Sequence, residues 1–295
     1  MPVSPPRPKM PQLNALRAFE AAARLSSISA AADELCVTPA AVAQQVKALE
    51  AWTGEKLFKR NAKGVSLTPL GSSVLKNFSA AFDSLGEAVQ KLRTNAAPFE
   101  VRIAALPSIA QLWVSPRLPE IRSAMPEISV SVSALEQKPN LLRDPFDLAV
   151  FYEDSETESQ AIRLMQDSIF LVCSPDLAKR LKTVGDLAGE VFLHDSTWKN
   201  DWNTWLSVAS PHQNLNKSGP EFSLYALAVE ECKNGAGVLI GHEALVRPQI
   251  EAGQLVAPFE LKVTLPLKLA FSTMKPLEDN SVLSKVATML TAGTF

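Results

Sequence analysis

The chain has 295 residues, of which 46% are hydrophobic and 20% are charged, and its formal net charge is −2. This length favours about two domains, and the hydrophobic share is that of a globular protein with a sizeable core. No apolar run reaches the roughly 18 residues that a membrane-spanning helix needs, and the proline-rich start lacks the apolar segment of a signal peptide. We therefore expect a cytoplasmic protein with no membrane partner, beginning in a flexible tail at residues 1–11.

The small net charge conceals an uneven distribution along the chain. Residues 1–95 contain 12 Lys and Arg against 7 Asp and Glu, a net of +5, whereas the remainder contains 17 against 24, a net of −7. A basic N-terminal part joined to an acidic larger part is typical of a protein that binds nucleic acid at one end and something else at the other.

Residues 12–69 have the pattern of three short helices followed by a small β-hairpin. Three- and four-residue spacing predicts an apolar face on the first helix, formed by Leu13, Leu16, Phe19 and Ala23. Ser29 is a candidate cap for a short second helix. Thr38 and Pro39 mark the start of the third, because a threonine hydroxyl accepts a free backbone N–H and proline fits the first helical position. With Gly64 reversing the chain between two strands, this is the layout of a winged helix-turn-helix, which inserts one helix into the DNA major groove.

The outward face of the third predicted helix has the chemistry of a base reader. With Val42, Val46 and Leu49 facing inward, the small apolar groups left outside can contact a thymine methyl, and Gln44 can pair with adenine. Basic residues of the helix and hairpin, Lys59 among them, can neutralise phosphates. Taken singly, each of these residues is equally consistent with an ordinary solvated helix surface, so the prediction depends on their combination. The predicted DNA contacts are Thr38, Pro39, Ala40, Ala43, Gln44, Lys47, Arg60, Lys63 and Thr68.

A family resemblance becomes visible in the same residues. The run VTPAAVAQQVKALE, followed by LFKR and GVSLTPLG, closely resembles the N-terminal domain of LysR-type transcriptional regulators. These motifs are most similar to those of the branch that contains the glycine-cleavage activator and the β-lactamase regulator. The resemblance extends over nearly the whole chain. Two departures are Ala43, where many relatives have serine, and Ile28, where phenylalanine is commoner.

Residues 70–95 predict one long helix with an apolar stripe. The stripe consists of Leu70, Val74, Phe78, Phe82, Leu85, Val89 and Leu92. Such a stripe needs a cover, which is either the helix's own domain or a second copy of the helix. The resemblance implies the second copy, and hence a homodimer or homotetramer that reads a partly palindromic operator on double-stranded DNA and recruits RNA polymerase.

Beyond residue 98, strand-like and helix-like stretches alternate. Strand candidates include residues 101–106, 147–152 and 237–242, which argues for an α/β fold with mainly parallel sheets. The resemblance implies an effector-binding domain at residues 98–295, like the periplasmic solute-binding proteins. On that resemblance, two α/β subdomains enclose a cleft for a small-molecule effector; subdomain I covers 98–166 and 264–295, and subdomain II covers 167–263.

Loops at strand ends and helix N-termini would line such a cleft. The candidate effector contacts are Ser108, Ile109, Phe151, Tyr152, His194, Ser223 and Leu224. Ser108 and Ser223 are equally consistent with a purely structural role as helix caps. A serine that caps a helix can also contact a ligand. Tyr152 follows Phe151 where close relatives often have an arginine, which weakens the case for a simple carboxylate effector and leaves its identity open.

Other chemistries find little support. Cys36, Cys173 and Cys232 are too few and too widely spaced for a disulfide framework or a zinc site, so we expect buried, unreactive thiols. The three histidines have no metal-ligand spacing. His194, Asp195 and Ser196 are neighbours in sequence, but a catalytic triad requires convergence in space. We therefore expect no enzyme activity, metal or cofactor.

Two alternatives remain to be tested. In the first, the chain is an α/β solute-binding or enzymatic protein whose residues 13–70 form an ordinary helical cap. In the second, the chain binds DNA but responds to oxidation of Cys173 or Cys232 rather than to a ligand.

Overall fold

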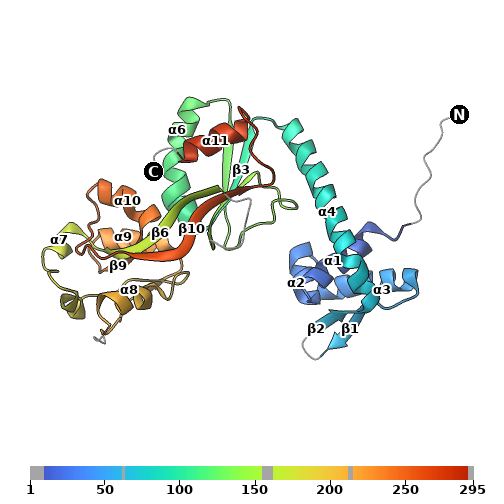
Figure 1. The fold of residues 1–295 in the computed structure, drawn as a ribbon, viewed down its shortest axis with the longest axis horizontal. Helices are drawn as coiled ribbons and strands as arrows, with labels where there is room; N and C mark the ends of the chain where they lie inside the picture. The colour runs from blue at the N-terminus through green and yellow to red at the C-terminus, as the bar shows by residue number, and fades with distance from the viewer. Residues whose placement is uncertain (1–9, 62–63, 155–161, 212–214, 292–295) are drawn as a thin grey trace. The chain divides into compact units, whose positions relative to one another are not determined.

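The computed structural model describes residues 10–61, 64–154, 162–211 and 215–291 (Figure 1). The chain divides into two compact units, Met1–Arg93 and Thr94–Phe295. Most of the expected N-terminal tail lies outside the described residues. No helix in the described part of the chain is both long enough and apolar enough to cross a membrane.

The first unit is a helical bundle with a two-stranded hairpin. Its elements are α1 (Leu13–Arg24), α2 (Ile28–Leu35), α3 (Pro39–Thr53), β1 (Phe58–Asn61), β2 (Gly64–Leu67) and α4 (Pro69–Ala96). The predicted cap of α2 is wrong by two residues. Ser27 has an extended backbone and its hydroxyl accepts the N–H of Ala30 at 3.2 Å, so the helix begins at Ile28 and Ser29 lies inside its first turn.

Small side chains let the three helices of the first unit pack closely. Alanines from α1 and α2 are buried against Val42 and Val46 of α3. Phe19 is fully buried, with its ring 5.5 Å from that of Phe58 and 5.8 Å from that of Phe78. Leu13 does not belong to this core, because it is the first residue of α1 and remains 53% exposed.

The apolar stripe of α4 divides into two parts. Val74, Leu75, Phe78 and Phe82 pack on the core of the first unit. Leu85, Val89 and Leu92, farther along the helix, are 46%, 47% and 70% exposed. The middle of the stripe is therefore covered by its own domain, whereas Leu70 at its start, 40% exposed, and the second half of the stripe are not.

The second unit alternates strands and helices. Its first half comprises β3 (Glu100–Ala105), α5 (Pro107–Ile109), η1 (Ala110–Val114), η2 (Ser115–Arg117), α6 (Leu118–Ala124), β4 (Ser129–Ala134), β5 (Leu148–Asp154) and β6 (Ile162–Val172). There follow α7 (Pro175–Ala178), η3 (Val184–Gly189), β7 (His194–Asp195), α8 (Asp201–Ala209), β8 (Glu221–Phe222), α9 (Tyr225–Lys233), β9 (Leu239–His242), α10 (Glu243–Glu251), β10 (Val263–Thr273) and α11 (Val282–Thr291).

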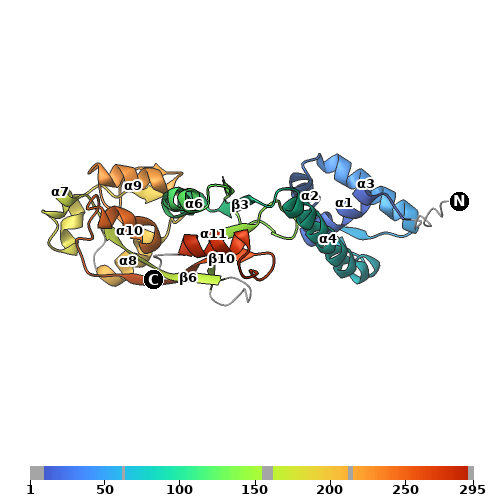
Figure 2. The ribbon, with the colours of Figure 1, turned by 90° about the horizontal axis from the view of Figure 1, so that it is seen from above.

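The main sheet of this unit is mixed. Its strand order is β4-β3-β5-β10-β6-β9, and β7 pairs separately with β8. β3 runs parallel to β4 and β5, but β10 is antiparallel to both β5 and β6, and β6 is antiparallel to β9. The expectation of mainly parallel pairing is therefore wrong. The cause is the pair of 11-residue strands β6 and β10, which run side by side in opposite directions through the unit (Figures 1 and 2).

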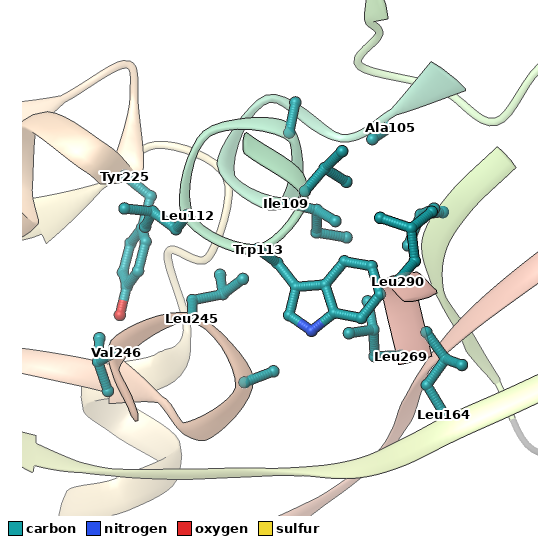
Figure 3. Close-up of a cluster of buried hydrophobic side chains, with 14 of the residues drawn as sticks. Ala105, Ile109, Leu112, Trp113, Leu164, Tyr225, Leu245, Val246, Leu269 and Leu290 are labelled. Carbon is teal, nitrogen blue, oxygen red and sulfur yellow. The ribbon is translucent and has the colours of Figure 1, made fainter. Parts of the chain in front are cut away.

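One hydrophobic cluster connects most of the second unit. Trp113 of η1 is fully buried at its centre, among Ile109, Leu245, Leu269 and Leu290 (Figure 3). These residues come from both of the expected subdomains. A second cluster, around Trp205 and Phe192, contains residues of the expected subdomain II alone. In Figure 1, α9 and α10 lie above the end of the sheet formed by β6 and β9, and α8 lies below it.

Candidate DNA-reading surface and effector site

The third helix of the first unit presents the surface expected of a recognition helix. The Thr38 hydroxyl accepts the N–H of Ala41 at 3.2 Å and Pro39 occupies the first turn, as predicted. Val42, Val46 and Leu49 are buried, which confirms the inward face. On the other side the predicted contacts Thr38, Pro39, Ala40, Gln44 and Lys47 are exposed, and Ala43 is half-buried.

A buried carboxylate joins this helix to the hairpin. Glu50, near the end of α3, accepts the backbone N–H groups of Leu57 and Phe58 at 3.0 and 3.3 Å through one oxygen. Its other oxygen lies 2.6 Å from the ammonium of Lys56. Burial raises the pKa of Glu50, but the contacts with Lys56 and the two amides outweigh it, so the pKa lies below its ordinary value. Sequence reasoning missed Glu50, because its partners are backbone groups that no sequence pattern marks.

The three remaining candidate DNA contacts, Thr68, Arg60 and Lys63, lie outside α3. The Thr68 hydroxyl donates to the carbonyl oxygen of Lys56 at 2.8 Å and accepts the N–H of Gly71 at 3.1 Å, so it caps α4. Arg60 lies in β1, opposite Val65 of β2. Lys63 lies outside the described residues. These three DNA contacts, like the other six, stay predictions.

Ser108 and Ile109 of the second unit lie in the short helix α5. Ile109 is fully buried in the cluster around Trp113 (Figure 3). Ser108 does not cap the helix, because α5 begins at Pro107 and Leu106 holds the cap position. The Ser108 hydroxyl is instead buried without a hydrogen-bond partner.

Phe151 and Tyr152 point to opposite faces of β5, as successive residues of a strand must. Phe151 packs with Ala104, Leu141 and Ala149. Tyr152 lies on the other face, with its ring centroid 5.9 Å from those of Trp198 and His242. The Tyr152 hydroxyl is buried, and burial, reinforced by its interaction with the carboxylate of Asp167, raises its pKa well above the ordinary value.

His194 and Ser223, two further predicted effector contacts, have other surroundings than the Tyr152 ring. His194 of β7 lies 2.8 Å from the carbonyl oxygen of Lys217, and its ring faces Trp202. Ser223 is exposed and does not cap α9, because Leu224 precedes the helix and no side chain supplies a cap bond. Their role as effector contacts stays a prediction.

A buried ion network beside Tyr152 centres on His242, the last residue of β9. The ring donates from Nδ1 to Asp167 of β6 at 2.5 Å and from Nε2 to Asp201 of α8 at 2.8 Å. Burial lowers the pKa of His242, but the two aspartates outweigh it and raise it to about 9. The imidazolium is therefore charged at neutral pH, and the Trp198 ring lies against it at 4.0 Å between centroids.

The loop after β7 contributes one further acidic group. Asp195 is buried, and its Oδ1 accepts the N–H groups of Thr197 and Trp198 at 2.8 and 3.1 Å. Its Oδ2 is buried without a partner, and burial raises the pKa of this carboxyl above its ordinary value. Sequence reasoning noted Asp195 beside His194 but did not choose it, and had no signal for Trp198 or for the partners of His242.

The cysteines only partly follow expectation. Cys173 and Cys232 are buried, whereas Cys36 is exposed. Burial raises the pKa of the Cys173 thiol to about 11 and that of Cys232 further, which disfavours the reactive thiolate. Among the described residues, no group of three or more His, Cys, Asp or Glu side chains could hold a metal ion.

Comparison with known proteins agrees with both units. Residues 13–72 match the bacterial regulatory helix-turn-helix of the LysR family, and residues 99–288 match the LysR substrate binding domain. The chain is 38% identical over 256 residues to the glycine cleavage system transcriptional activator of Escherichia coli K12, covering 85% of this chain and 83% of that protein. It is 30% identical over 269 residues to the transcriptional activator AmpR of Citrobacter koseri, covering 90% and 93%.

Solved structures show the same fold at lower identity. ArgP of Mycobacterium tuberculosis superimposes with a TM-score of 0.55 at 18% identity, over 95% of this chain and 96% of that one. The effector domain of AmpR from Pseudomonas aeruginosa gives 0.50 at 19% identity, over 65% and 93%. On the matches to both domains and the identity to the curated relatives, the chain belongs to the LysR family of transcriptional regulators.

Proposed function

We propose that this protein binds a specific operator on double-stranded DNA through α3 and the β1–β2 hairpin, and that a small-molecule effector bound to the second unit controls its activity. The observation that carries the DNA-binding part is the exposed outer face of α3, where Pro39, Ala40, Gln44 and Lys47 are presented by a capped helix whose inner face is buried. A protein of this kind acts where the DNA is, in the cytoplasm, and needs no catalytic activity.

The first test is fluorescence-anisotropy binding to the duplex upstream of its own coding region, with a scrambled duplex as control, at two salt concentrations. Tighter binding to its own promoter supports a sequence-specific regulator. Equal, salt-sensitive binding to both duplexes leaves only a generic basic domain. No binding to either supports the alternative of a solute-binding or enzymatic protein.

Replacing Gln44 by alanine should reduce the preference for the operator by about five- to 150-fold, because a lost base contact costs about 1–3 kcal/mol of discrimination. The matched control is Lys59→Ala in β1, an exposed residue of the hairpin. It should weaken binding to all duplexes alike and reduce the salt slope by about one. Equal losses on specific and random duplexes in both variants would contradict this division of labour.

We propose that the protein is a homodimer or homotetramer, because the exposed half of the α4 stripe needs a cover. Two copies of α4 would place two recognition helices on a two-fold related, partly palindromic site. The double variant Val89→Glu, Leu92→Glu should be monomeric in light scattering and should bind the operator at least tenfold more weakly. Lys91→Glu, an exposed change on the same helix, serves as the control. A dimer that survives the double change would show that another surface holds the copies together.

In the second unit we propose that the effector shifts the balance between two arrangements of subdomains I and II, with the boundaries given above. The ligand must bind one arrangement more tightly than the other, and the difference reaches the DNA and RNA polymerase through the dimer. The thiol alternative predicts that a Cys173→Ser, Cys232→Ser double variant loses its response. A retained response would exclude it, as the burial of both thiols leads us to expect.

A further inference from the structure

A buried carboxylate joins three helices of the first unit. Glu20 of α1 is 2% exposed, and its Oε1 accepts hydrogen bonds from the hydroxyl of Ser79 in α4 at 2.8 Å and from Nε of Arg24 at 3.2 Å. The guanidinium of Arg24 also donates to both carboxylate oxygens of Glu34 in α2, at 2.5 and 2.6 Å. A chain of charged hydrogen bonds therefore runs from α4 through α1 to α2, the helix just before the recognition helix α3.

This network is not needed for contact between α1 and α4. Phe19 of α1 already packs against Phe78 of α4, with the ring centroids 5.8 Å apart. Burying a charged group costs free energy, and apolar residues of similar volume often stabilise a protein as well or better. Directional bonds add a fixed register, because apolar surfaces can slide or rotate against each other, whereas a hydrogen bond between two side chains breaks when they do. The network therefore controls orientation.

Ser79 lies close to the point where α4 leaves the core of the first unit. Among the described residues, Phe82 is the last side chain of α4 that packs on this core. From Leu85 onward the apolar stripe is exposed, and the later half of α4 extends away from the three shorter helices (Figure 1). The helix from Ser79 to Ala96 is about 25 Å long, so a rotation of about 5° at Ser79 moves its far end by about 2 Å.

We propose that Ser79, Glu20 and Arg24 set the angle between α4 and the recognition helix, and that this angle determines which spacing of operator half-sites the dimer accepts. The proposal rests on the proposed function, in which two copies pair through the exposed end of α4 and each reads one half-site. All three are positioning residues, since they act on DNA only through the helices that they connect. With a fixed angle the two recognition helices keep a fixed separation, and an operator of the wrong spacing engages one helix at a time.

The test measures binding of the full-length protein to duplexes that differ in spacing. A footprint on the duplex upstream of its own coding region locates the half-sites, and base pairs are then inserted or removed between them. Each inserted base pair turns one half-site by about 35° and moves it by about 3.4 Å. The wild type should bind the duplex with one inserted base pair about tenfold more weakly than the natural one, because both recognition helices no longer engage fully. A duplex with a single half-site is the reference.

Replacing Ser79 by alanine should relax this preference. The change removes the donor to Glu20 but leaves Arg24 to balance its charge, and alanine is a better helix former than serine. The loss caused by one inserted base pair should shrink to about threefold, while affinity for the single half-site should stay within about twofold of the wild type. A folding defect would weaken binding to every duplex alike, so these two readouts separate orientation from stability.

Two further variants serve as controls. Ser79→Thr keeps a hydroxyl for Glu20 and should keep the wild-type spacing preference. Ser73→Ala is the matched control, because the exposed Ser73 hydroxyl donates to the carbonyl oxygen of Leu70 in its own helix at 2.8 Å. It should also behave as the wild type does.

The outcomes separate this inference from the proposed function. An unchanged spacing preference in Ser79→Ala, or an equal relaxation in Ser73→Ala, would overturn the inference alone. A wild type that binds every spacing equally, or does not bind the duplex at all, would overturn the proposed paired reading of two half-sites, and the inference with it.

Discussion

Replacing His242 by alanine should lower the free energy of unfolding of the second unit by about 3–5 kcal/mol. The change removes the cation that Asp167 and Asp201 bind at 2.5 and 2.8 Å and leaves their charges uncompensated inside the protein. It also empties the space beside the Trp198 ring. Denaturant unfolding followed by tryptophan fluorescence measures the loss.

The matched control is His194→Ala. His194 is partly exposed and makes a single bond to a backbone oxygen, so its loss should cost about 1 kcal/mol. Similar losses in the two variants would show that the ion network contributes little to stability. In the double variant His242→Ala, Asp167→Asn the loss should be smaller than the sum of the single losses, because the neutral side chain no longer needs a buried counter-charge.

The same network predicts how stability changes with pH. The pKa of His242 is about 9 in the folded protein and 6.5 in its unperturbed state, so its contribution is complete below pH 6.5. It is lost as pH rises through about 9. The groups that face His242 are Asp167, Asp201, Asp195, Tyr152 and Tyr225. Between pH 7 and 10 the wild type should therefore lose more stability than His242→Ala, and parallel curves would contradict the assignment.

The second large effect is expected at Glu50. Glu50→Ala removes the acceptor of two backbone N–H groups and the partner of Lys56. We expect the first unit to lose about 2–3 kcal/mol, since a buried N–H without a partner costs about 1–3 kcal/mol. Operator affinity should fall about tenfold, because the hairpin no longer holds its place against the end of α3. Thermal unfolding and anisotropy measure the two effects.

Glu55→Ala provides the comparison for Glu50. Glu55 lies just beyond α3 and is exposed, so its loss should change stability by less than about 0.5 kcal/mol. Glu50→Gln should fall between the two, because the amide oxygen still accepts the N–H groups while the charge is gone. Full operator affinity in Glu50→Ala would show that the hairpin does not depend on this carboxylate.

The recognition helix was predictable because its signals are local. Thr38 and Pro39 act on backbone groups within a few residues, and the four- and three-residue spacing of Val42, Val46 and Leu49 follows from helix geometry. Ser29 shows the limit of such signals. Two serines compete for one helix start, and the backbone conformation at Ser27 decides between them. Strand direction is not local at all, so the antiparallel course of β6 and β10 left no mark in the pattern of alternating elements.

The candidate effector site could be predicted from the sequence only in part, for the same reason. Tyr152 could be found because it lies at a strand end, where ligands commonly bind. The partners of His242 lie 75 and 41 residues away on other elements, so no spacing could join them. Ser108 was chosen as a cap, and the structure shows that its hydroxyl is unpaired. An unpaired hydroxyl is free to bind a ligand, whereas the hydroxyl of a helix cap is already bonded.

The position of β10 has a consequence for synthesis of the protein. β10 pairs with β5 on one side and with β6 on the other, yet it follows every other strand of the sheet in the chain. Until residue 273 has left the ribosome, β5 and β6 each keep one unpaired edge, and unpaired strand edges invite aggregation. Among the described residues, the core clusters of the first unit contain side chains only up to Phe82. We therefore expect this unit to fold during translation, while the nascent second unit depends on chaperones until its sheet closes.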